Sequence, residues 1–269
     1  MVTRLQEPGW LKSSAVDVSI FGRINMRRYF EAVWRKWLTV GSGNEAARAV
    51  WVERALKLIP SGTRLLDAGA GEGIFRKFCS HLRYVSQDFG KYDGHGNGMG
   101  QQPGTWETSH CDIICDITAI PEPDASFGAI LCTEVFEHLP EPLKALAEFS
   151  RLLEPGGRLI LTAPFCSLTH MSPYHFYTGF NRYFYEYHLP RHRFSIVEIT
   201  PNGNYFSYVA QELRRLPSKA DAYAKRSLTL LEKILAALVL ISIQRIEKRD
   251  SNSAEFGCFG YHVMAEKIR

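Results

Sequence analysis

One stretch decides the fold: Leu65-Leu66-Asp67-Ala68-Gly69-Ala70-Gly71-Glu72-Gly73-Ile74. Apolar residues lead into an acidic residue, and three glycines follow at alternate positions. This order predicts a buried parallel strand, a tight turn and the start of a helix, because glycine permits positive φ and lets a ligand approach the backbone. The dinucleotide-binding pattern G-x-G-x-x-G does not fit, since Ile74 stands where that pattern has its third glycine.

The length of the chain is enough for one large α/β domain or for a domain plus a cap. The chain has 269 residues, is 45% hydrophobic and carries a net charge of +4. The first twenty residues contain no unbroken apolar run, so no secretion signal is predicted. The apolar run 234–243 is too short to cross a bilayer. The six cysteines form no C-x-x-C pair, which favours reduced thiols in a cytoplasmic protein.

Charge is distributed unevenly along the chain. Residues 107–154 hold ten acidic and two basic side chains, whereas residues 182–249 hold twelve basic and six acidic ones. Most such runs are solvated helix faces. The other interpretation is a basic cap that faces an anionic acceptor or a membrane surface. The sequence does not indicate an oligomeric state.

Strand-like and helical segments alternate along the first two thirds of the chain. Strands are predicted at 64–67, 84–88, 111–115, 127–132 and 158–162. Helices are predicted at 46–59, from residue 74 onward and at 143–153. Two further strands, 194–200 and 257–265, complete the pattern, the second of them antiparallel. The fold class predicted is α/β, a Rossmann-like, doubly wound, seven-stranded, mostly parallel sheet with a helical cap.

Three regions are expected along the chain. The first is a pair of N-terminal helices in residues 1–60, the second a core in residues 61–165, and the third residues 166–269. The first helix is predicted from an apolar stripe of Tyr29, Phe30, Val33, Trp34 and Trp37. The third region combines an aromatic lid segment, helical insertions at 166–192 and 203–249, and the last two strands.

Acidic residues end the first three predicted strands, at the edge where sheets of this type bind ligands. Asp67 ends the first strand and Asp88 the second. A carboxylate in the second position can accept hydrogen bonds from both hydroxyls of a ribose. Asp116 ends the third strand, where it can accept from an adenine amine while Ile117 packs on the ring.

These segments resemble the class I S-adenosylmethionine (SAM)-dependent methyltransferases, in the Methyltransf_11-type branch that includes the quinone-biosynthesis O-methyltransferases. The resemblance covers roughly residues 45–165 and rests on the D-x-G-x-G-x-G turn, Cys115-Asp116-Ile117, the run Glu134-Val135-Phe136-Glu137-His138-Leu139 and the run Leu153-Glu154-Pro155-Gly156-Gly157. It implies SAM as cofactor and S-adenosylhomocysteine as product. The cofactor-binding residues expected are Asp67, Gly69, Ala70, Gly71, Gly73, Asp88, Phe89, Asp116, Ile117, Thr133 and Glu134.

The glycine-rich loop 90–104 departs from this resemblance, because most relatives have a helix soon after the second acidic residue. The ribose carboxylate is therefore Asp88 or Asp93, and the loop is a candidate cover for cofactor or substrate. Alternative roles are an Asx turn for Asp116 and a brace of the glycine turn for Asp67.

Three histidines are candidates for a catalytic base: His138, His170 and His175. An oxygen nucleophile must lose a proton during methyl transfer, and histidine is the commonest base near neutral pH. His138 follows the fourth predicted strand. The other two lie in the segment after the fifth strand, which forms the substrate lid in the family that the chain resembles. The alternative role of His138 is to brace its turn.

The remaining patterns point less clearly to a function. His188 and His192 have helical metal-ligand spacing, but we expect Pro190 between them to disrupt a helix, so no metal site is predicted. The aromatic residues of 174–187 are either a lid helix packed on the sheet or the walls of a substrate pocket.

The function expected is methyl transfer from SAM to a small-molecule or sugar-containing acceptor, with O-methylation favoured and an anionic acceptor preferred by the basic cap. One alternative is N- or C-methylation of a small molecule or of RNA, although the small net charge does not favour nucleic acid. The other is a non-catalytic SAM-binding subunit or sensor. Residues 228–243 leave room for peripheral contact with a membrane.

Overall fold

The computed structural model describes residues 38–268. The chain divides into two compact units, Met1–Thr39 and Val40–Arg269, and the described strands and helices all belong to the second. The predicted apolar stripe from Tyr29 to Trp37 lies outside the described residues.

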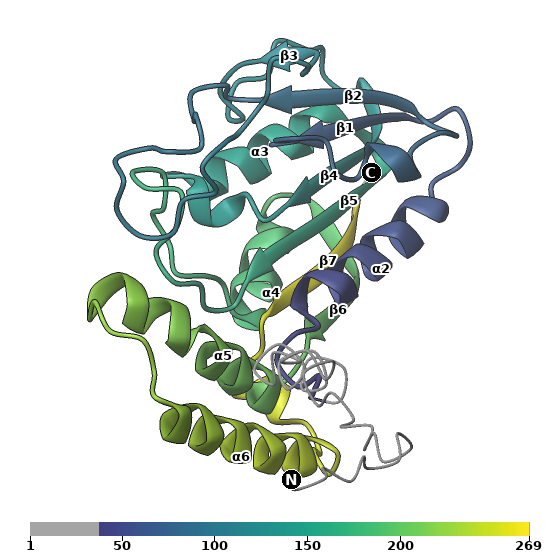
Figure 1. Ribbon diagram of the computed structural model, residues 1–269. Helices are drawn as coiled ribbons and strands as arrows, with labels where there is room; N and C mark the ends of the chain where they lie inside the picture. Colours follow the sequence, from purple (N-terminus) through teal and green to yellow (C-terminus); the bar gives the residue numbers. More distant parts are fainter. Residues whose placement is uncertain (1–37, 269) are drawn as a thin grey trace, which may run out of the picture. The chain divides into compact units, whose positions relative to one another are not determined.

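A seven-stranded sheet with the order β3-β2-β1-β4-β5-β7-β6 forms the centre of this unit (Figure 1). Six strands are parallel, and β7 pairs antiparallel with both β5 and β6. The predicted Rossmann-like α/β class with an antiparallel last strand is therefore confirmed. The strands are β1 (Arg64–Ala68), β2 (Arg83–Asp88), β3 (Ile113–Ile114), β4 (Phe127–Thr133), β5 (Leu153–Pro164), β6 (Phe194–Asn202) and β7 (Gly260–Lys267).

The strand order reverses between β1 and β4, which places a topological switch point there. In open sheets of this kind, ligands bind in the crevice beyond the carboxyl ends of the strands at that point. The chain leaves β1 at Ala68 and β4 at Thr133. The glycine turn and the Glu134–Leu139 run are thus the segments that begin at this edge.

Helices cover both faces of the sheet (Figure 1). One face packs against α2, through Trp51, Val52 and Leu56. The other face packs against α3 and α4, and its core contains the fully buried side chains of Phe149 and Tyr185. The helices are α2 (Asn44–Lys57), the short 3-10 helix η2 (Arg76–Phe78), the 3-10 helix η3 (Phe136–His138), α3 (Pro142–Leu152), α4 (Arg182–Arg191), α5 (Tyr205–Tyr223), α6 (Leu230–Glu247) and the 3-10 helix η4 (Ser253–Glu255).

The helix α3 shows why the sequence folds as predicted in this part of the chain. Pro142 occupies its first turn, where a missing N–H costs nothing. Its apolar residues recur at three- and four-residue spacing, and Leu146 and Phe149 are completely buried. Burying one such side chain stabilises the fold by about 1.5–3 kcal/mol. The segment Glu154–Gly157 then forms an irregularity at the start of β5 rather than a separate turn.

The expected helix after the glycine turn is wrong. Residues 71–75 form successive turns, and only the single-turn helix η2 follows. Gly69, Gly71 and Gly73 all have positive φ, so the turn extends as far as Gly73. Because β2 already begins at Arg83, the chain from Ile74 to Leu82 is also too short for a helix that returns along the sheet.

Three further predictions need correction. The third strand is only two residues long, because Asp112 accepts hydrogen bonds from the backbone N–H and hydroxyl of Ser86 instead of extending the ladder. Residues 166–181 form no helix. Pro190 does not disrupt α4, since it lies in the last turn of the helix and its missing N–H removes at most one helical hydrogen bond.

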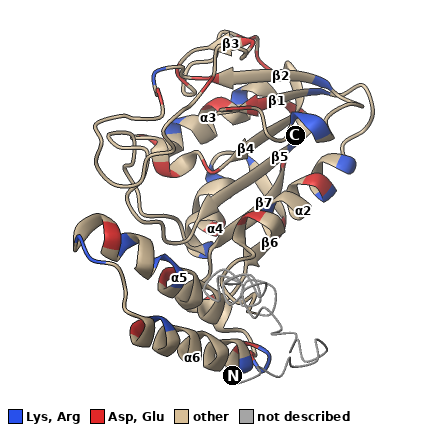
Figure 2. Cartoon of the chain, viewed as in Figure 1, with Lys and Arg blue, Asp and Glu red and all other residues tan. Residues whose placement is uncertain are grey.

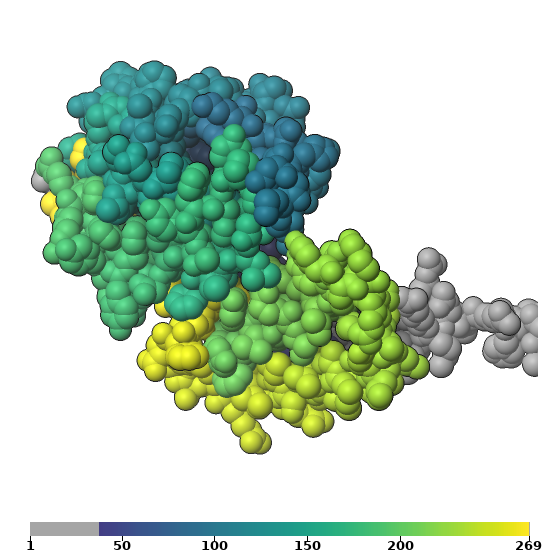
Figure 3. Space-filling view, turned by 90° about the vertical axis from the view of Figure 1, so that its left-hand side faces the viewer, coloured from purple at the N-terminus to yellow at the C-terminus, as the bar shows by residue number. Residues whose placement is uncertain are grey.

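The helices α5 and α6 form a hairpin between β6 and β7, and Figure 3 shows its surface set off from that of the first half of the sheet. Both basic and acidic residues lie along this hairpin in Figure 2. Residues 38–268 include no helix long and apolar enough to span a membrane. However, α6 exposes a row of large apolar side chains: Leu230, Leu231, Ile234, Leu235, Leu238 and Val239.

Candidate functional site

The glycine turn is shaped by close neighbours as well as by its φ angles. A Cβ added at Gly69 would lie 2.5 Å from the Cγ2 atom of Val135, and one added at Gly71 would lie 2.6 Å from the Cζ2 atom of Trp106. A larger residue at either position would have to displace its neighbour and adopt a positive φ, so glycine is favoured at both. Val135 belongs to the run after β4, so the glycine turn and that run touch at the predicted ligand-binding edge.

Asp88 is buried beside the glycine turn, at the end of β2. One of its carboxylate oxygens accepts the N–H of Gly71 (3.1 Å) and the other accepts the N–H of Gly90 (2.9 Å). A carboxylate oxygen can accept two hydrogen bonds, so each oxygen keeps capacity for a hydroxyl of a ligand. The structure thus brings Asp88 and the glycine turn together.

Asp67 is also buried, and its carboxylate accepts a hydrogen bond from the Tyr84 hydroxyl at 2.6 Å. Burial raises the pKa of Asp67 to about 7, the Tyr84 hydrogen bond opposes that rise, and the charge of Asp88 adds to it. This hydrogen bond joins β1 to β2 just before the glycine turn.

The two other acidic candidates sit in turns of their own. Asp116 is exposed and accepts hydrogen bonds from the N–H and hydroxyl of Thr118 at 2.8 Å. This is an Asx turn, which leaves the second carboxylate oxygen for a ligand. Asp93 accepts from the N–H groups of His95 and Gly96 in the exposed loop. Ile117 is buried in the main core.

Glu134 holds the chain in a sharp turn as it leaves β4. Its φ of +53° is uncommon for a residue other than glycine. The carboxylate makes an ion pair with Arg48 of α2 at 2.9 Å and accepts the Thr162 hydroxyl at 2.9 Å. Thr133 is paired with Thr162 in the sheet. Glu134 is therefore already neutralised within the protein.

The three candidate histidines converge into one cluster. The ring centroids of His138 and His170 are 4.7 Å apart, those of His170 and His175 are 4.7 Å apart, and those of His138 and His175 are 6.0 Å apart. His138 ends η3, whereas the other two lie in the loop between β5 and α4. The backbone oxygen of Glu137 accepts the N–H of Phe176 (2.9 Å), which ties η3 to that loop.

Hydrogen bonds fix the tautomers of two of these rings. The Nδ1 atom of His138 lies 2.5 Å from the carbonyl oxygen of Tyr174, and the Nδ1 atom of His170 lies 2.9 Å from that of Leu168. A carbonyl oxygen can only accept, so both Nδ1 atoms carry the proton and both Nε2 atoms present a lone pair. Burial, with a smaller effect of His170, lowers the pKa of His138 to about 4.

The glycine-rich loop packs on the segment that carries His170 instead of lying free. Gln101 pairs with this segment, donating its N–H to Thr169 and accepting that of Met171. A Cβ at Gly100 would lie 2.6 Å from the carbonyl oxygen of Thr169, and one at Gly96 would overlap that of Ser172. The glycines of this loop thus serve a close backbone approach that places His170.

An aromatic cluster links the two loops and was not foreseen from the sequence. The rings of Phe89 and Tyr174 meet edge to face at 5.0 Å, and Tyr92 contacts both Tyr174 and Trp106. Trp106 in turn lies over Gly71. An aromatic residue inside a polar, glycine-rich segment was the only sequence signal for Trp106.

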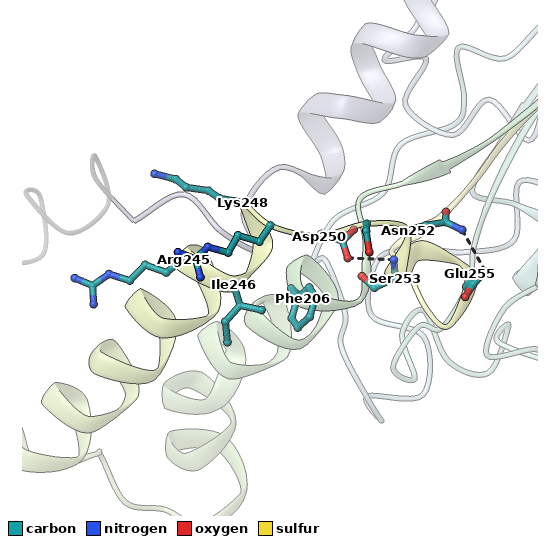
Figure 4. A pocket seen from close by; sticks show the side chains of 10 residues that line it. Phe206, Arg245, Ile246, Lys248, Asp250, Asn252, Ser253 and Glu255 are labelled. Carbon is teal, nitrogen blue, oxygen red and sulfur yellow. Dashed lines mark hydrogen bonds between the residues drawn. The ribbon is translucent and has the colours of Figure 1, made fainter.

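A cavity of about 950 Å³ lies elsewhere in the molecule, at the end of α6 (Figure 4). It is lined by residues of α5, α6 and the segment 248–255, among them Phe206, Arg245 and Asp250. None of the sequence-predicted site residues contributes to it.

Comparisons with known proteins identify the family of the chain. The model of the methyltransferase domain family matches residues 43–223. A ubiquinone biosynthesis O-methyltransferase of Xanthomonas axonopodis pv. citri is 28% identical over 109 residues, which cover 39% of this chain and 45% of that protein. An uncharacterized methyltransferase of Mycobacterium sp. (strain JLS) is 27% identical over 112 residues, 41% of this chain and 42% of that protein. The chain thus spans less than half the length of these curated relatives.

Two solved structures share the fold. A SAM dependent methyltransferase from Archaeoglobus fulgidus has a TM-score of 0.51 at 15% identity, with 89% of this chain and all of that one covered. The cyclase SpnF has a TM-score of 0.51 at 17% identity, covering 83% of this chain and 81% of that one. Because the family model covers more than half of the residues, this chain belongs to the methyltransferase domain family and carries a SAM-dependent methyltransferase domain.

Proposed function

We propose that this chain transfers the methyl group of SAM to a hydroxyl oxygen of a small-molecule or sugar-containing acceptor. The convergence of His138, His170 and His175 into one cluster carries the proposal. A hydroxyl must lose its proton when it attacks, so a cluster of neutral imidazoles suits an oxygen acceptor. The O-methyltransferase named among the relatives supports the same choice.

The cofactor site proposed consists of the glycine turn, Asp88 and the end of β3. Asp88 is the better candidate for the ribose, because its carboxylate is fixed against Gly71 while each of its oxygens keeps a free acceptor position. Asp93 lies in the exposed loop and is engaged in a turn there. Asp116 and Ile117 would hold the adenine, from the next strand along.

His175 is the base that we assign. Its Nε2 atom lies 3.0 Å from the Ser167 hydroxyl, which donates to the carbonyl of Thr178 at 3.0 Å. The ring is thereby oriented with its Nδ1 lone pair available. Burial lowers the pKa of His175, so the ring is neutral at pH 7. His138 suits this task less, because a pKa of about 4 makes it a weak base.

The reaction then follows in one displacement. The acceptor oxygen attacks the SAM methyl in line, the new O–C bond forms as the S–C bond breaks, and the hydroxyl proton passes to His175. S-adenosylhomocysteine, the methylated acceptor and a protonated imidazole result. Orientation and exclusion of water supply much of the rate in such a step.

The first experiment is calorimetric titration of the purified chain with SAM and with S-adenosylhomocysteine, with NAD as the control. We expect both sulfur compounds to bind and NAD not to bind. A screen with methyl-labelled SAM then compares matched acceptors that carry a hydroxyl or an amine at the same position. Transfer to the amines alone would contradict O-methylation, and absence of SAM binding would favour a non-catalytic role.

A further inference from the structure

Glu137 lies beside the histidine cluster without a hydrogen-bonding partner for one of its oxygens. The residue is 1% exposed, and no group of residues 38–268 makes a hydrogen bond with its Oε2 atom. Leaving a buried carboxylate oxygen unpaired is costly, by about 1–3 kcal/mol or more. Such an atom calls for a ligand or a cation that completes its environment.

The atoms around Glu137 are those that a transition metal prefers. A carboxylate oxygen of Glu137 and one ring nitrogen each of His138 and His170 all lie within 4.8 Å of one another. The distance between Glu137 Oε1 and His138 Nε2 is 3.7 Å. Ligands of a tetrahedral Zn²⁺ ion at 2.0–2.2 Å would be about 3.3 Å apart. Two ligand atoms at the 4.8 Å limit would therefore approach each other by about 1.5 Å when the ion binds.

The hydrogen bonds of the two histidines prepare them for this role. Each donates its Nδ1–H to a backbone carbonyl and so presents the lone pair of Nε2. Metal-binding histidines characteristically donate their other N–H to a carbonyl or carboxylate, which fixes the ring and its tautomer.

We propose that Glu137, His138 and His170 bind a divalent transition-metal ion of the zinc type. Two imidazoles and one carboxylate form a ligand set that leaves a fourth position open for water or an oxygen of a ligand. Glu134 is not part of the set, because Arg48 and Thr162 already engage its carboxylate. His175 lies beside the set and stays available as a base.

A metal here would also orient the acceptor, a step that rests on the proposed function. An acceptor oxygen in the open position would be polarised and would lose its proton more easily. Metal binding itself does not depend on methyl transfer, and it is measured without SAM or an acceptor. Failure of one proposal can therefore be distinguished from failure of the other.

The test is titration of the untagged, chelator-treated full chain with Zn²⁺ by calorimetry, followed by Co²⁺ with its visible spectrum. We expect one Zn²⁺ per chain, and binding at least about 10-fold weaker in Glu137→Gln and in His170→Ala, since even outer-shell partners of a metal site typically contribute 10–100-fold. The matched control is His188→Ala, which lies in α4 and should bind as the wild type does.

Three results would overturn the proposal: no Zn²⁺ binding, equal affinity of the wild type and both ligand variants, or a Co²⁺ spectrum with thiolate charge-transfer bands. Glu137→Gln is nearly isosteric, so we expect its melting temperature in chelator to equal or exceed that of the wild type. His170 is half-buried in a loop, so His170→Ala keeps the test decisive if the other variant folds poorly.

Discussion

The two sides of the predicted ligand-binding edge differ in how their polar groups are satisfied. On the side of β1 and β2, backbone N–H groups meet Asp88 and the Tyr84 hydroxyl meets Asp67. On the side of β4, the buried Glu137 has an oxygen that no described residue partners. We call the first side finished, because its buried carboxylates have hydrogen-bonding partners within the protein. We call the second side incomplete, because a buried oxygen of Glu137 has no such partner among the described residues.

The largest expected effect concerns the stability contribution of Asp67 on the finished side. The Asp67 carboxylate has only one hydrogen bond from a described side chain, that of Tyr84. Its folded-state pKa of about 7 lies above the usual value of 3.8, so the folded protein holds a proton there that the unfolded chain has lost. The protonated Asp67 carboxyl therefore contributes a free energy of stabilisation that is fully present below pH 4 and is lost as the pH rises to 7.

Asp67→Asn keeps an acceptor for Tyr84 and removes the titration. We expect the variant to gain stability over the wild type between pH 4 and pH 7, by at most about 4 kcal/mol. Urea unfolding at pH 4.5 and pH 8 measures the gain. A constant difference between wild type and variant across this range would show that Asp67 is not protonated in the folded protein.

The second prediction concerns catalysis on the incomplete side. His175→Ala should lower kcat by about 100-fold at saturating SAM, as is typical for loss of a positioned base. The Kd of SAM should stay unchanged, because His175 is not part of the proposed cofactor site. Steady-state kinetics and calorimetry measure the two quantities. His188→Ala is the control, and equal kcat for both variants would remove His175 from the mechanism.

The third prediction sharpens the role of the finished side. Asp88→Ala should weaken SAM binding by about 10-fold or more, the loss expected when charged hydrogen bonds to the ribose go. Asp93→Ala, in the neighbouring loop, should bind SAM as the wild type does. Weaker SAM binding in Asp93→Ala and unchanged binding in Asp88→Ala would assign the ribose contact to Asp93 instead. Circular dichroism of both variants checks that the fold is retained.

The smallest expected effect compares two glycines with positive φ. Alanine in the left-handed region costs about 1–2 kcal/mol wherever it is placed. Gly156 (φ +83°) has no neighbour within 4 Å of an added Cβ, so Gly156→Ala should show this strain alone. Gly71→Ala should lose more, because Trp106 must move. Thermal unfolding measures the loss of stability in both variants. Equal losses would mean that Trp106 moves aside at no cost in free energy.

The strands and their order follow largely from local patterns. Apolar runs that end in Asp67, Asp88 and Asp116 predicted three neighbouring strands, and the sheet order agrees with the resemblance noted for residues 45–165. The missing helix after the glycine turn was also readable in principle, since too few residues separate Gly73 from Arg83. A helix was nevertheless predicted there, because the glycine motif resembles the one that precedes a helix in the class I methyltransferases.

The histidine cluster could be predicted only in part. His138, His170 and His175 were each identified, but their convergence depends on a loop from β2 that pairs with the loop after β5. Trp106 over Gly71 depends on the same long-range packing. No local periodicity encodes such contacts, because they join segments that are far apart in the chain. Glu137 belongs to a run that carries the family resemblance, but nothing in that run marks its side chain as a ligand.

The pairing of Gln101 with the Thr169–Met171 backbone has a kinetic consequence. One of these loops follows the strand that ends in Asp88, and the other carries two of the histidines. The same two backbone hydrogen bonds therefore connect the proposed cofactor site with the proposed acceptor site. If these hydrogen bonds break to admit one ligand, the binding site of the other ligand changes as well. We therefore expect a compulsory order of addition, which product-inhibition patterns with S-adenosylhomocysteine would reveal.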